Sequence, residues 1–340
     1  MNFFRRSSSK RNAKGVLGDS SDSDLNIPRW TKVRPCEWPH NAFINEAGFY
    51  QEFAQFVANA GLTDFLADEC DYHHILTNSF VQYFHFLNRL EPPEVRFDLY
   101  AEHYQIPLAE FCEICLIPFD GEIREPRLEE FEGFLHTLTM GEERGVSKAR
   151  ATSLQFPSVH YFALFLGKCL TAREQGGALC APDFAILRRA LYNDNTYNLG
   201  AIIARRLHTN RTRGKIHGGI YATRLARHFN VNIRPHDYLL PRVYLDHQSM
   251  RDHHFLDALE PPHHIRYNLV FSEDTRDIIL LPAPALFDSH ARNGYTVMPP
   301  DIGAYRNALA AVEEEPQDWD ARVPPPQEFH MGPDGYYGWP

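Results

Sequence analysis

The sequence predicts a mainly α-helical fold, with a single helical domain, one or two small β-hairpins and disordered tails. Apolar residues recur at helical spacing through most of the 340-residue chain, while strand-like alternation is confined to two short segments. Neither an internal repeat nor a linker divides the middle of the chain. At 44% hydrophobic residues, the chain can build one sizeable core. We therefore predict a domain at 36–312, flanked by tails at 1–35 and 313–340.

The two ends of the chain have the composition of disordered segments. Residues 1–35 begin basic and serine-rich and continue into the acidic GDSSDSD, and residues 313–340 are rich in proline, glycine and aromatic residues. A short basic run near the N-terminus is a candidate for nuclear import, although a solvated tail is the simpler interpretation. That run comprises Arg5, Arg6, Lys10 and Arg11.

The absence of an apolar leader at the N-terminus predicts an intracellular protein, in the nucleus or the cytoplasm. No run of about eighteen apolar residues occurs, so we expect no membrane span and no membrane partner.

Apolar stripes predict the helices of the first half in order. A stripe that ends at Gly61 contains Phe49, Phe53, Phe56, Val57 and Ala60. The stripe of a second helix, broken at Pro92, contains Phe80, Val81, Phe84 and Leu87. A third helix follows Pro107, and its stripe contains Leu108, Phe111, Cys112 and Cys115.

In the second half, prolines at 157 and 182 open two further helices. Alternating apolar residues predict one strand at 95–99 and a hairpin at 265–281.

A basic stretch between Asn195 and His236 stands out because it contains eight Arg and Lys residues and no Asp or Glu, although the whole chain is formally −10. Such segregation of charge indicates a site for an anion. We predict a helix from about 199, a polar glycine-bearing loop, and a second helix from about 219. Arg206 falls inside the apolar stripe of the first helix and must either extend to the surface or find an acidic partner.

The remaining cations of this helix pair are the candidate nucleic-acid-binding residues Arg211, Arg213, Lys215, Arg224 and Arg227. The long loop and the absence of a complete Walker pattern exclude a DNA-reading helix-turn-helix and a phosphate loop, which leaves contacts with the RNA or DNA backbone. The alternative is that these cations pair with the excess carboxylates, such as Glu129, Glu130 and Glu132. The sequence leaves both interpretations open.

The sequence contains no motif that predicts catalysis, a metal site or a cofactor. Cys112 and Cys115 form a CxxC without a second pair, and they fit the buried face of a helix better than a zinc or redox site. Asp64, Asp68 and Asp71 could be drawn as a metal site with nearby histidines, but a solvated helix end is the simpler interpretation. We predict a protein without enzymatic activity.

Six segments together resemble the Arabidopsis retrotransposon Orf-one protein family, from plant Athila-type elements of the gypsy class with long terminal repeats. The segments are ILTNSFVQYFHF (75–86), VRFDLYAEHYQIPLAEFCEICLIPFDG (95–121), FPSVHYFALFLGKCL (156–170), LGAIIARRLHTNR (199–211), GGIYATRLARHFNV (218–231) and LPAPALF (281–287). The resemblance implies a Gag-position or accessory protein with no established enzyme activity. From the acid-free basic stretch we further expect that the protein self-associates or binds nucleic acid. The chain lacks the CCHC zinc knuckle of ordinary Gag proteins. A domesticated nuclear chromatin factor is the alternative function.

Overall fold

The computed structural model describes residues 32–139, 149–171, 178–211, 215–256, 265–270 and 276–282. Within them the fold is mixed α/β, with five small sheets beside the helices. The prediction of a mainly α fold with one or two hairpins was therefore wrong. Most of the unpredicted strands are only two or three residues long and pair with distant segments, so they leave no alternating pattern in the sequence.

The helices and strands alternate irregularly along the chain. The α-helices are α1 (Asn41–Glu46), α2 (Tyr50–Ala60), α3 (Thr63–Ala67), α4 (His74–Gln82), α5 (Leu108–Cys115), α6 (Glu132–Leu138), α7 (Pro157–Phe165), α8 (Ala181–Tyr192), α9 (Leu199–Asn210), α10 (Gly219–His228) and α11 (His247–Asp252). Short 3-10 turns are η1 (Leu128–Phe131) and η3 (Ala151–Ser153), and a π-helical turn, η4 (Leu166–Leu170), continues α7.

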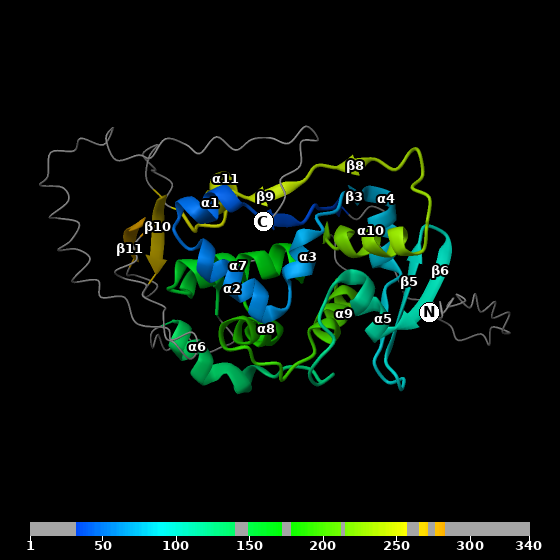
Figure 1. The fold of residues 1–340 in the computed structure, drawn as a ribbon, viewed down its shortest axis with the longest axis horizontal. Coiled ribbons are helices and arrows are strands. Elements are labelled where there is room, and N and C mark those ends of the chain that lie inside the picture. Colours follow the sequence, from blue (N-terminus) through cyan, green and yellow to red (C-terminus); the bar gives the residue numbers. More distant parts are fainter. Residues whose placement is uncertain are drawn as a thin grey trace, which may run out of the picture.

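The strands are β1 (Lys32–Val33), β2 (Glu37–Pro39), β3 (Tyr72–His73), β4 (His85–Leu87), β5 (Glu94–Leu99), β6 (Glu102–Pro107), β7 (Lys215–Ile216), β8 (Leu239–Leu240), β9 (Val243–Leu245), β10 (Ile265–Val270) and β11 (Arg276–Leu281). The largest sheet has the order β4-β5-β6, and β10 and β11 form the predicted hairpin. These two antiparallel units lie at opposite ends of the molecule (Figure 1).

Helices α2, α7 and α8 form the middle of the molecule (Figure 1) and meet through aromatic side chains. The Phe53 ring packs edge-on against Tyr161, Phe162 and Phe165 at centroid distances of 5.6 to 6.0 Å. Such edge-to-face pairs stabilise a core beyond the area that they bury. Gly61, at φ 71°, adopts the left-handed conformation that ends α2, as its position after the stripe predicts.

The other half of the molecule packs α4, α5, α9 and α10 against each other and against the inner face of the β4-β5-β6 sheet. Val95, Phe97 and Leu99 point inward from β5, as their alternation predicts. Cys112 and Cys115 are buried free thiols on α5, which confirms that this CxxC is part of the core.

Three pairs of very short strands join segments that are far apart in the sequence. β1 pairs with β7 and β2 pairs with β9, both in parallel, and β3 pairs with β8 in antiparallel orientation. The Glu37 carboxylate of β2 adds side-chain links to α11 and to the π-helical turn. It accepts a hydrogen bond from Ser249 (2.7 Å) and lies 3.2 Å from His253 Nε2 and 3.3 Å from Lys168 Nζ.

Most predicted helices are present, but the second one ends early. α4 ends at Gln82, and Leu87, expected on its apolar face, belongs instead to β4. Phe80 and Phe84 still contact each other in the core, at a centroid distance of 5.2 Å. Strand β6, between the predicted strand and the predicted third helix, was missed.

The described chain begins with β1, so residues 32–35, which the prediction placed in the N-terminal tail, include a paired strand. The rest of that tail, the candidate import residues and the tail at 313–340 lie outside the described residues. None of the described helices combines the length and the apolar character that a membrane-spanning helix requires.

Candidate nucleic-acid interface and an adjoining pocket

Helices α9 and α10 occur as predicted, but the structure separates their cationic residues into two groups. The arginines of α10 contact the end of α3, whereas Arg211, at the C-terminal end of α9, contacts β4. Arg213 lies outside the described residues, and only the backbone of Lys215, in β7, is described. The structure therefore does not bring the α10 arginines and Arg211 together into the single cationic patch that the sequence predicts.

Arg224 is buried, with 3% of its surface exposed, and its contacts stabilise the fold. Its guanidinium donates to Asp68 Oδ2 (3.1 Å) and to the carbonyl oxygens of Phe65 (2.6 Å), Asp68 (2.8 Å) and Cys115 (2.7 Å). It also lies 4.5 Å from the centroid of the Phe65 ring. With these donors occupied, Arg224 has no free face for a phosphate, so its assignment to the interface is corrected.

Arg227 also binds Asp68, at 3.3 Å, but its side chain is 53% exposed. The interpretation that the cations pair with carboxylates thus holds for the two α10 arginines, although the partner is Asp68. Glu130, one of the acids suggested from the sequence, pairs with Arg124 instead.

Helical spacing misjudged Arg224 because α10 is covered on more than one side. Every residue from Gly219 to Ala226 is buried, and α10 packs against α4, α5 and β3 at once. A stripe analysis assumes one buried face, so it assigned Arg224 to a solvent-exposed face. A buried arginine in such a helix could be recognised only through its acidic partner, which lies 156 positions away in the sequence.

Arg211 is the predicted site residue whose surroundings best suit an anion. It is partly buried, and its Nη1 lies 2.9 Å from each of the two ring nitrogens of His85. The neighbouring ring of His208 stands edge-on to His85, and burial together with the charge of Arg211 lowers its pKa. Two histidines and one arginine therefore meet here.

The pairing of β1 with β7 adds cationic positions that the sequence did not associate with this stretch. Its register sets Lys32 opposite Lys215, and Arg34 follows directly, with an exposed side chain. Within the described residues, neither Arg34 nor Arg211 has a carboxylate within ion-pair distance. Arg96 lies across from His85 on β5, but Glu94 and Asp98 flank it on the same face of the strand, so it adds little net charge.

Arg205 extends from α9 toward the segment before η1. Its guanidinium donates to the carbonyl oxygens of Ile123 (2.8 Å) and Arg124 (3.0 Å), and it lies 5.4 Å from the centroid of the Phe86 ring. Burial lowers its pKa, and the negative charge of Glu125 partly offsets that effect. Arg205 thus fixes the position of this segment, and the negative charge of Glu125 offsets its positive charge.

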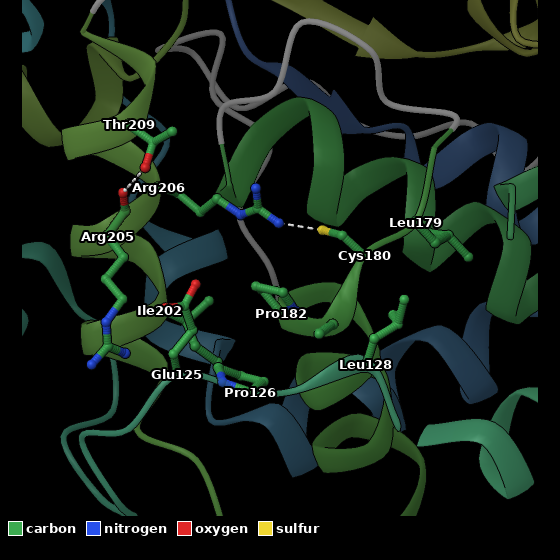
Figure 2. Close-up of a pocket in the computed structure, with 11 residues that line it drawn as sticks. Glu125, Pro126, Leu128, Leu179, Cys180, Pro182, Ile202, Arg205, Arg206 and Thr209 are labelled. Atoms are coloured by element: carbon green, nitrogen blue, oxygen red, sulfur yellow. Dashed lines mark hydrogen bonds between the residues drawn. The ribbon is translucent and has the colours of Figure 1, made fainter. Parts of the chain in front are cut away.

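A pocket of about 480 Å³ lies between this segment, α9 and the start of α8 (Figure 2). Its lining residues are Glu125, Pro126, Leu128, Leu179, Cys180, Ala181, Pro182, Ile202, Arg205, Arg206 and Thr209. Figure 2 shows the Arg206 side chain reaching across from α9 to the sulfur of Cys180, to which its Nη2 donates.

Cys180 and Asp183 form a capping box at the start of α8. The backbone N–H of Cys180 donates to Asp183 Oδ2 (2.9 Å), and the Cys180 thiol donates to the same oxygen (2.6 Å). A capped first turn holds Cys180 in place beside Arg206. The other five cysteines are buried, so Cys180 is the one partly exposed thiol of the chain.

Within the described residues, no group of three or more His, Cys, Asp and Glu side chains is arranged to hold a metal ion. Two of the three acidic residues considered for such a site have other partners: Asp68 binds the α10 arginines and Asp71 binds Arg242 at 3.0 Å.

No family model matches the chain, and neither a curated protein nor a solved structure is similar enough to match it. The resemblance to retrotransposon proteins therefore stays a prediction that rests on the six sequence segments.

Proposed function

We propose that the protein is a non-enzymatic, retrotransposon-derived protein of Gag-like or accessory type, inside the cell, that binds the phosphate backbone of RNA or DNA. In this proposal, the binding surface is the face at the end of α9 and the β1–β7 pair. It consists of Arg34, Arg211 and Lys215, with Lys32 and the two histidines beside them.

The observation that carries the proposal is that some arginines have a carboxylate partner and others have none within the described residues. Arg124, Arg188 and Arg227 each lie within 3.3 Å of a carboxylate oxygen. Arg34 and Arg211 have no such partner in the described part of the chain. A cation without a counter-ion is the natural contact for a phosphate, and contacts of this kind bind RNA or DNA without reading its sequence.

The test compares two triple variants that remove the same number of positive charges. Arg34→Ala/Arg211→Ala/Lys215→Ala removes the proposed contacts, whereas Arg124→Ala/Arg188→Ala/Arg227→Ala removes arginines that have carboxylate partners. Binding of labelled single-stranded RNA, single-stranded DNA and duplex DNA is measured by fluorescence anisotropy at several salt concentrations.

Each phosphate contact contributes about 0.7 to the slope of log affinity against log salt for single strands, so the first variant should lose up to about 2 of that slope. The second variant should keep the wild-type slope. Equal losses in the two variants would show that only net charge matters, and an unchanged first variant would refute the proposed surface.

The transposon origin has its own test. We expect the DNA around this reading frame to carry long terminal repeats, with protease and polymerase frames downstream. We also expect the purified protein to self-associate, which sedimentation velocity over a range of concentrations would detect. An isolated intact gene that encodes a monomer would contradict the Gag-like part of the proposal, whatever the result of the binding experiment.

A further inference from the structure

Arg206 occupies a position of α9 where its neighbours are core residues. Ile202, Ile203 and Leu207 on the same side of the helix are buried, as the apolar stripe predicts. Arg206 is itself partly buried, and its Nε is inaccessible to water and has no hydrogen-bond partner. Within the described residues, its one hydrogen bond goes to the sulfur of Cys180, and no carboxylate pairs with it.

A partly buried guanidinium without an anion is costly, because a charge removed from water must be compensated by a partner. Sulfur is a weak acceptor, so one contact with Cys180 leaves most of the five N–H donors of Arg206 uncompensated. Arg224 of α10, which is more deeply buried, has a carboxylate and three carbonyl oxygens around it. Arg206 lacks this complement within the described chain.

The pocket next to Arg206 offers space for such a complement. Apolar side chains line much of it, among them Leu128, Leu179 and Ile202. Glu125 is the carboxylate among the lining residues, and its charge acts on Arg205. The charges of Arg205 and Glu125 offset each other, so Arg206 gives the lining residues one formal positive charge. The buried Asp183 carboxylate, which is not a lining residue, accepts from the same Cys180 sulfur and forms no ion pair with Arg206.

We propose that this pocket binds a small carboxylate with an apolar body, in addition to the proposed nucleic-acid binding and independently of it. The planar fork of Arg206 would take the carboxylate in a bidentate contact, beside Cys180. The apolar body would lie against Leu128 and Ile202. One net positive charge matches a monoanion better than a doubly charged phosphate monoester, and pockets of several hundred Å³ with apolar walls and few polar groups suit small ligands.

Cys180 provides a reporter inside the pocket. Iodoacetate and iodoacetamide alkylate a thiolate by the same displacement, in which the sulfur bonds to the methylene carbon, iodide leaves and the thiol proton goes to the buffer. The two reagents differ in that iodoacetate is itself a small carboxylate. The rate at each cysteine is measured by peptide mass spectrometry, and the chain unfolded in urea gives the reference ratio for the same cysteine.

We expect the iodoacetate-to-iodoacetamide rate ratio at native Cys180, normalised to the unfolded reference, to fall about fivefold from wild type to Arg206→Leu, the effect of removing one unit charge roughly 4 Å away in water. Comparing the two proteins holds constant the opposing charge of Asp183, whose carboxylate accepts from the same sulfur. Leucine suits the apolar stripe of α9, and Arg206→Lys, which keeps the charge without the fork, should retain an intermediate ratio. Equal normalised ratios in wild type and Arg206→Leu would overturn the proposal.

A second measurement uses only the wild-type protein and therefore does not depend on how a variant folds. Millimolar 4-phenylbutyrate should slow the alkylation of Cys180 by iodoacetamide and raise the thermal unfolding midpoint, because a ligand that binds only the folded state stabilises it. The neutral 4-phenylbutyramide, of the same shape, should do neither. Equal effects of the acid and the amide would show an apolar cavity without anion recognition and would refute the proposal.

Discussion

Replacement of Glu37 by glutamine tests how the short strand β2 is held to the rest of the molecule. Glu37 is 17% exposed, and its carboxylate contacts Ser249 and His253 on or next to α11 and Lys168 of the π-helical turn. Burial alone would raise the pKa of this carboxyl. The hydrogen bond from His253, the charge of Lys168 and the hydrogen bond from Ser249 more than offset burial and lower the pKa to about 2, from an ordinary value of 4.5.

The size of the effect follows from this shift. A lowered carboxyl pKa stabilises the folded state above the unfolded-state pKa, and the stabilisation is lost as the pH falls toward the folded-state pKa. At about 1.4 kcal/mol per pKa unit, Glu37 contributes up to about 3 kcal/mol at pH 7. The same linkage leaves about 1.5 kcal/mol at pH 3 and almost nothing below pH 2.

The assay is urea unfolding of wild type and Glu37→Gln at several pH values between 7 and 2.5. We expect a loss of about 3 kcal/mol at pH 7 that shrinks as the pH falls below 4.5. Glu46→Gln is the matched control, because Glu46 lies 3.2 Å from His247 but is 52% exposed, and exposed pairs contribute about 0 to 1 kcal/mol. A Glu37→Gln loss no larger than the control, or one that does not change with pH, would refute this account.

Two further predictions concern buried charge and buried histidine. Arg224→Leu should lower the free energy of unfolding by about 3 kcal/mol, because it removes the buried arginine that donates to Asp68 Oδ2 and to two buried carbonyl oxygens. Arg227→Leu on the same helix should cost less than about 1 kcal/mol, and equal losses in urea titrations would contradict the different roles of the two arginines. Burial, with a smaller effect of His253, lowers the pKa of His160 to about 3 from 6.5, so the folded state excludes a proton that the unfolded chain binds below pH 6.5. Neutral His160 therefore costs no stability above pH 6.5, and below it the free energy of unfolding falls by about 1.4 kcal/mol per pH unit because of this residue. The free energy of unfolding of His160→Phe should decline less steeply between pH 6.5 and 4. An unchanged slope would count against a buried neutral His160.

The arginines show where inference from the sequence succeeds and where it stops. The acid-free stretch marks a concentration of positive charge, and Arg206 was recognised as an arginine on an apolar stripe. Neither observation could indicate which cations have partners, because the carboxylate that binds Arg224 belongs to Asp68, 156 positions away in the sequence. The same limit concealed Lys32 and Arg34, which join Lys215 only through the β1–β7 pair.

The pocket was not predicted for a related reason. Its walls come from the segment at 125–128, the start of α8 and one face of α9, and no motif connects these three segments. The one available signal was Arg206 itself, whose place on the stripe required a partner that the sequence did not identify.

The sequence by itself determined the local elements whose pattern repeats within one segment. These include the α2 stripe that Gly61 ends, the alternation of β5, the α5 stripe with both cysteines and the hairpin of β10 and β11. Only the tertiary structure decided the two-residue and three-residue strands, the burial of Arg224 and the position of Arg206 beside a pocket. The physical reason is that periodicity reports one buried face along a segment, whereas strand pairing, ion pairing and cavities depend on which distant segments fold against each other.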